Sequence, residues 1–124
     1  MGKYYEIPQN CTYEQFAKLY IQLNLYTAKY VRQFSMFEKN ILYVGDEEVI
    51  YPEKGVCTTT FHTSELKIVQ RQSSSVCCSI RISDLLLSER PYECIAKKIN
   101  NFPYILCDAV LHTDQYGVQR LIFI

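Results

Sequence analysis

The sequence has no tryptophan, few glycines and prolines, and no excess of charge of either sign. Four glycines and four prolines among 124 residues exclude a collagen-like or low-complexity chain, and 48% hydrophobic residues exclude a disordered one. Thirteen basic and thirteen acidic residues give a formal net charge of zero, so no overall field attracts the protein to nucleic acid or to an anionic membrane. We expect one globular domain over residues 1–124, with neither nucleic acid nor a membrane as its partner.

The sequence also lacks a hydrophobic run long enough to cross a membrane, and residues 1–8 contain no apolar signal core. These absences favour a cytoplasmic location, which is the host cytoplasm if a phage or virus encodes the protein. Six cysteines are irregularly spaced and flanked by aliphatic residues, so we expect reduced and mostly buried thiols. No glycine-rich phosphate loop, nucleophile elbow or dinucleotide fingerprint is present, and no cofactor is expected.

A capping box marks the start of the first predicted helix. Thr12 can accept a hydrogen bond from the backbone of Gln15, whose side chain can accept one from the backbone of Thr12. The apolar periodicity then predicts a helix over residues 13–34, with a continuation up to residue 39. At 100° per residue its apolar side chains spread over an arc of about 220°, about twice the width that a helix needs to cover one sheet. Such a helix needs a second partner besides its own sheet.

The excess apolar surface of this helix predicts a homo-oligomer, because a monomer would leave one flank of the helix exposed. The eleven tyrosines agree with this prediction, since tyrosine suits interfaces. The residues expected at the interface between copies are Ala17, Leu19, Ile21, Tyr26 and Ala28.

Short alternating segments predict that the rest of the chain is mostly antiparallel sheet. A five-strand meander is expected over residues 41–44, 49–51, 56–62, 66–72 and 76–82. A second helix begins at Pro91, and residues 104–112 and 118–124 form a C-terminal hairpin. The inward face of the second helix is expected to carry Tyr92, Ile95, Ala96, Ile99 and Phe102. The predicted fold class is α+β, with the sheet covered by a long N-terminal helix and a shorter second helix.

A turn at residues 73–75 would place four polar side chains on one face of the two strands that it joins. Alternation puts Lys67 and Arg71 on one strand opposite Ser79 and Arg81 on the other. Arginine makes bidentate contacts with phosphate, so this face could hold a phosphate, a nucleotide or an acidic segment of a partner. An ordinary solvated sheet face is the alternative.

The two histidines stand in a repeated pattern of cysteine, three residues, an apolar residue, histidine and threonine. The pattern begins at Cys57 and at Cys107 and contains His62 and His112. It predicts no metal site, because residues five apart on a strand lie on opposite faces and ~16 Å from each other.

The first copy of this pattern offers a second functional hypothesis. The residues His62, Thr63 and Ser64 resemble one half of the His-x-Ser/Thr pattern of the two-histidine phosphoesterases. The resemblance implies a phosphodiesterase acting on nucleotides, in which His62 and His112 serve as base and acid. The second copy departs from the family pattern, because Asp114 stands where the pattern has a hydroxyl.

The leading hypothesis from the sequence is a binding protein without chemistry of its own, since no catalytic motif is recognisable. It would act as a homo-oligomer that sequesters or blocks another molecule, either a partner protein or a small anionic, phosphate-containing ligand. The expected ligand-binding residues are Lys67, Arg71, Ser79 and Arg81. The alternative is the small two-histidine phosphodiesterase.

Overall fold

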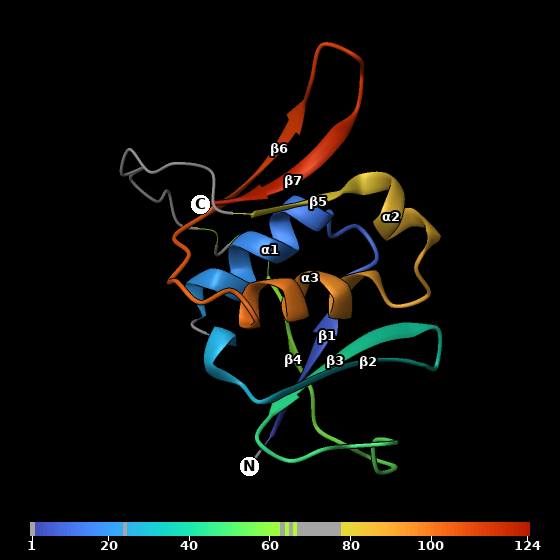
Figure 1. The fold of residues 1–124 in the computed structure, drawn as a ribbon. Helices are drawn as coiled ribbons and strands as arrows, with labels where there is room; N and C mark the ends of the chain where they lie inside the picture. Colours follow the sequence, from blue (N-terminus) through green and yellow to red (C-terminus); the bar gives the residue numbers. More distant parts are fainter. Residues whose placement is uncertain (1, 24, 63, 65, 67–77) are drawn as a thin grey trace.

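Two β-sheets enclose the two longer helices of the protein (Figure 1). The computed structural model describes residues 2–23, 25–62, 64, 66 and 78–124. In it, helices α1 (Tyr13–Gln22) and α3 (Pro91–Asn100) lie between sheet A, below them in Figure 1, and sheet B, above them. The α+β class predicted from the sequence is confirmed.

Sheet A has four strands in the described part of the chain, in the order β2-β3-β1-β4. They are β1 (Lys3–Ile7), β2 (Tyr30–Met36), β3 (Lys39–Gly45) and β4 (Thr59–Thr60). Strand β3 is antiparallel to both β1 and β2, and β4 is parallel to β1. Alternate side chains, such as those of Tyr5, Val31 and Leu42, join the hydrophobic core, as expected for a sheet that is covered on one face.

Sheet B has three antiparallel strands in the described residues, in the order β5-β7-β6. They are β5 (Cys78–Arg81), β6 (Ala109–Thr113) and β7 (Gln119–Phe123), and the short helix α2 (Ile82–Leu87) follows β5. Ala109, Leu121 and Phe123 are fully buried and belong to the same hydrophobic cluster as the core side chains of sheet A. The predicted C-terminal hairpin is confirmed.

Helix α1 begins where its capping box predicts. The backbone N–H of Gln15 donates to Thr12 Oγ1 at 3.1 Å, and the backbone N–H of Thr12 donates to Gln15 Oε1 at 3.0 Å. In the first turn of α1, Glu14 Oε2 accepts the backbone N–H of Leu111 at 3.0 Å. The start of α1 is therefore fixed both by its own cap and by a bond to β6.

The prediction of a helix over residues 13–34 is wrong. Helix α1 ends at Gln22, a short 3₁₀ helix, η1 (Leu25–Thr27), follows, and residues 30–36 form β2. Phe37 and Glu38 have positive φ angles of 50° and 62° in the two-residue turn to β3. The predicted apolar arc was too wide because it combined the residues of α1 with those of β2. Strand β2 has apolar residues on both faces, and such a pattern fits a helical period as well as a strand period.

Four of the five residues predicted at an interface between copies are buried in the protein or pack against its core. Ala17, Leu19 and Ile21 are 0%, 3% and 4% exposed, and Ala28 packs against the same core. The side chain of Tyr26 lies outside the described part of the structure. The surface on which self-association was predicted is therefore used within one copy, and this physical reason for a homo-oligomer is removed.

The predicted five-strand meander does not match the structure. The strand expected at residues 41–44 is part of β3, but residues 49–51 form no strand and residues 56–62 contribute only β4. Most of the segment expected at 66–72 lies outside the described residues, and the segment at 76–82 contains β5. Strand β1 was not predicted. Its sequence does alternate, with Tyr5 and Ile7, which are buried in the structure, on either side of Glu6.

The second helix is confirmed. Helix α3 begins at Pro91, whose fixed φ suits the first helical position. The side chains predicted to face inward are buried, at 8% exposure or less for Tyr92, Ile95, Ala96 and Ile99, and Phe102 packs against them.

Candidate functional site

The outward face of sheet B carries a row of three basic side chains. In the strand register, Arg81 of β5 lies opposite Arg120 of β7, and Arg120 lies opposite His112 of β6. Directly opposed residues on neighbouring strands share a face, with Cβ atoms about 4.5–5.5 Å apart. Leu121, next to Arg120, is fully buried on the opposite face, so these side chains point away from the core. We call Arg81, Arg120 and His112 the basic row.

Each arginine of the basic row forms an ion pair with a carboxylate from a segment next to the sheet. Arg81 Nε lies 3.3 Å from Asp84 Oδ2 on α2, and both side chains are more than half exposed. Arg120 Nη1 lies 2.9 Å from Asp114 Oδ2, and these side chains are 37% and 23% exposed. A guanidinium has five N–H donors, so each ion pair uses only part of the donor capacity of its arginine.

Asp114 is a fixed carboxylate in the turn between β6 and β7. Its Oδ1 accepts the backbone N–H groups of Val118 at 3.0 Å and Tyr116 at 2.8 Å, while its Oδ2 accepts from Arg120. These hydrogen bonds, with that of Val118 the largest cause, hold the pKa of Asp114 below its usual value of 3.8. Asp114 therefore remains ionised at neutral pH and fixes the position of Arg120.

The sequence located part of this face. Ser79 and Arg81 share it as predicted, whereas Lys67 and Arg71 lie outside the described residues. The sequence reasoning did not place His112 and Arg120 on the same face. The available signal was the hairpin itself, because the length of its turn fixes which residues of the two strands lie opposite each other.

Asp108 does not belong to the basic row and does not pair with Arg120. The register places Arg120 opposite His112, and Asp108 is four residues earlier in the chain, about 13 Å along an extended strand. Asp108 Oδ1 instead lies 2.8 Å from Lys18 Nζ. This ion pair connects α1 to the start of β6 and is not part of the basic row.

The two histidines belong to different parts of the fold. His112 lies on β6 of sheet B, and His62 follows β4 of sheet A by two residues. Both side chains are exposed, and no hydrogen bond between them occurs among the described residues. The fold therefore gives no support to their joint action as acid and base.

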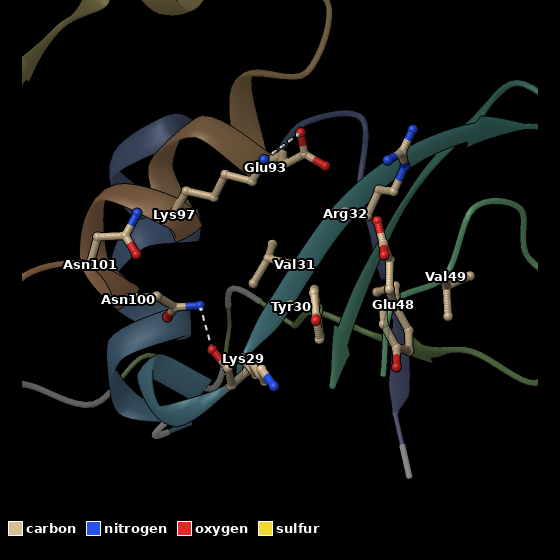
Figure 2. Close-up of a pocket in the computed structure, with 12 residues that line it drawn as sticks. Lys29, Tyr30, Val31, Arg32, Glu48, Val49, Glu93, Lys97, Asn100 and Asn101 are labelled. Carbon is tan, nitrogen blue, oxygen red and sulfur yellow. Dashed lines mark hydrogen bonds and ion pairs between the residues drawn. The ribbon is translucent and has the colours of Figure 1, made fainter. Parts of the chain in front are cut away.

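A cleft of about 510 Å³ lies along the outer edge of β2 (Figure 2). Helix α3 forms one side of it, the loop after β3 forms the other, and the first half of β2 lies between them, as Figure 2 shows. The residues on which its chemistry depends are Lys29, Val31, Arg32, Glu48, Glu93 and Lys97.

The charged groups of the cleft are unequally paired. Lys97 Nζ lies 3.6 Å from Glu93 Oε2, as the dashed line in Figure 2 marks. Lys29 and Arg32 form no ion pair within the described residues, and Arg32 lies over the ring of Phe34, with Cζ 5.8 Å from the centroid. In the same part of the chain, the buried Nε of Arg32 has no hydrogen-bond partner. Within the described residues, the cleft thus contains two cations without a carboxylate partner.

The cysteines differ in exposure. Cys11 is buried, and burial raises the pKa of its thiol to about 11. Cys78 and Cys94 are half-buried, whereas Cys57 and Cys107 are exposed. The prediction of buried thiols is therefore wrong for Cys57 and Cys107, which precede strands and do not lie within them.

The described residues contain neither a cluster of metal-ligating side chains nor a membrane-spanning helix. No group of three histidine, cysteine, aspartate or glutamate side chains there could hold a metal ion. No helix in the described segments is long and apolar enough to cross a membrane.

Comparison of this chain with protein families, with curated proteins and with solved structures found no match. The candidate sites therefore depend on the geometry of this chain alone.

Proposed function

We propose that this is a binding protein without catalytic activity, which captures a phosphate-containing ligand on the basic row of sheet B. It acts by sequestering that ligand or by blocking its use, in the manner of an inhibitor. The observation that carries the proposal is the direct opposition of Arg81 and Arg120 on neighbouring strands. The proposal does not require a homo-oligomer.

Two like charges opposite each other destabilise a pair of strands, so such a pair needs compensation from anions. Asp84 and Asp114 provide part of that compensation, and both follow the C-terminal ends of strands that run in the same direction, β5 and β6. A phosphate group would add charge-assisted, bidentate hydrogen bonds to the remaining guanidinium donors. Because neighbouring strands lie about 4.8 Å apart, the basic row favours a ligand with two or more anionic groups at a similar spacing.

Titration calorimetry of the full chain with inorganic tripolyphosphate and with linear and cyclic dinucleotides tests the proposal. Arg81→Gln and Arg120→Gln should each weaken binding by about 1.5–3 kcal/mol, the range for hydrogen bonds to charged groups. This loss corresponds to roughly a 10- to 150-fold higher Kd. Arg90→Gln is the matched control, because Arg90 is exposed and lies outside sheet B, and it should leave the Kd unchanged.

Three results would overturn the proposal. If none of these probes binds at millimolar concentration, or if both arginine variants bind as well as the parent, the basic row is not the site. If a dinucleotide is hydrolysed and both His62→Ala and His112→Ala abolish turnover, the protein is a phosphodiesterase, because an acid and a base that act as a unit fail together.

A further inference from the structure

The outer edge of β2 has backbone groups that find no partner among the described residues. In the described part of the chain, β2 is an edge strand of sheet A. The backbone N–H of Gln33 points away from β3 and donates to Glu93 Oε1 at 2.9 Å. Backbone groups alternate in direction along a strand, so Val31 presents its N–H and C=O to the same edge. Neither group of Val31 forms a hydrogen bond within the described residues.

The cleft gives this edge two side walls. Figure 2 shows Val31 between α3, which carries Lys97, and the loop that carries Glu48. An unpaired strand edge is a template for a further strand, which would lie 4.7–4.9 Å away. Glu93 covers the edge at Gln33 only, so the groups at Val31 remain available to a strand that enters the cleft.

The charges of the cleft indicate the chemistry of such a strand. Lys29 and Arg32 line the cleft, and neither forms an ion pair among the described residues. Of the two carboxylates that line it, Glu93 pairs with Lys97, whereas Glu48 has no ion pair in the described part of the chain. Two positive groups therefore oppose one negative group. The buried Nε of Arg32 has no hydrogen-bond acceptor in the described part of the chain. A carboxylate on the incoming strand would provide one.

We propose that the cleft binds an extended acidic segment of a partner protein, which adds to sheet A as a strand beside β2. The backbone of the segment pairs with Val31, and one of its carboxylates accepts hydrogen bonds from Arg32. In strand addition of this kind the main-chain bonds provide affinity and the side chains provide specificity. The site is on sheet A and the basic row is on sheet B, so either proposal can fail without the other.

Fluorescence anisotropy of the full chain with a labelled peptide of alternating valine and glutamate tests this site. The same peptide with lysine in place of glutamate is the charge control and should not bind. Arg32→Gln should weaken binding of the glutamate peptide at least about tenfold, as expected for loss of a charge-assisted contact. Lys98→Gln on α3 is the matched control and should bind as the parent does.

Two further measurements separate strand addition from simple charge attraction. Hydrogen exchange at the amide of Val31 should slow when the glutamate peptide binds. N-methylation of one alternate set of peptide nitrogens should abolish binding, whereas N-methylation of the other set should not, because only one set faces β2.

The proposal is overturned if the glutamate peptide does not bind at millimolar concentration, or if the lysine peptide binds equally well. Unchanged exchange at Val31, or equal binding of both N-methylated peptides, overturns it as well. If light scattering shows a dimer in which the amide of Val31 is already protected from exchange, and Arg32→Gln does not affect that dimer, the occupant is a second copy and the acidic partner is ruled out.

Discussion

Gln33 and Glu93, 60 residues apart in the sequence, bind each other's backbone. The N–H of Gln33 donates to Glu93 Oε1 at 2.9 Å, and Gln33 Oε1 accepts the N–H groups of Glu93 at 3.2 Å and Tyr92 at 2.9 Å. Gln33 thus caps α3, where the side chain of the N-cap residue, Arg90, forms no capping bond. This reciprocal contact sets the position of α3 against β2 and so forms one wall of the cleft.

Gln33→Ala should destabilise the fold. The substitution leaves the buried N–H groups of Tyr92 and Glu93 without their acceptor, and an unsatisfied buried group costs about 1–3 kcal/mol. Urea unfolding measures the change, with Gln115→Ala in the exposed turn of sheet B as the control, which should stay within about 0.5 kcal/mol of the parent. An unchanged midpoint for Gln33→Ala would contradict the capping role.

Ile21→Glu should unfold the protein and should not merely alter its association. Ile21 is 4% exposed within one copy, and burying an unpaired carboxylate costs several kcal/mol. Leu23→Glu, one residue beyond α1 where the side chain is 46% exposed, is the matched control and should remain folded. Circular dichroism shows whether the variant is folded, and native mass spectrometry shows whether the parent and the variant are oligomers. If the parent is an oligomer and Ile21→Glu is a folded monomer, α1 is an interface between copies after all.

The exposed thiols should react first. Brief alkylation of the native protein should modify Cys57 and Cys107, while Cys11 stays unmodified because it is buried and its pKa is raised to about 11. Mass spectrometry of the peptides gives the order of modification. Rapid labelling of Cys11 without denaturant would show that its thiol is not buried.

Acid should release the turn that holds Arg120. The pKa of Asp114 is lowered from 3.8, chiefly by the N–H of Val118, so its carboxylate stabilises the fold fully above that value. The stabilisation is lost as the pH falls through the lower pKa of the folded state. An NMR titration of the Asp114 carboxyl carbon should give a midpoint below 3.8, with the amide signals of Tyr116 and Val118 changing together. A midpoint at or above 3.8 is the contrary result.

Local chemistry made parts of the fold predictable. The capping box of Thr12, the first-turn Pro91 and the alternation of the C-terminal hairpin each act over a few residues, and each appears in the structure. The end of α1 was not predictable in this way, because the hairpin that follows it, formed by β2 and β3, was not recognised in the sequence. The turn of this hairpin, Phe37 and Glu38, lacks the glycine or asparagine that is usual in a two-residue turn. Without that mark, the strand before it was counted as helix.

The candidate sites needed the sheet register. Arg81 and Arg120 are far apart in the sequence, and only the pairing of β5 with β7 brings them together. The cleft depends on the contact between Gln33 and Glu93, for which the sequence contains no local signal.

The most direct test of the binding proposal is a titration of the isotopically labelled full chain with inorganic tripolyphosphate, followed by NMR. The basic row predicts that the largest shifts occur at the side chains of Arg81, Arg120 and His112, and that these shifts saturate together. Shifts centred on Lys29 and Lys97 in the cleft, or the absence of any saturable shift, would contradict it.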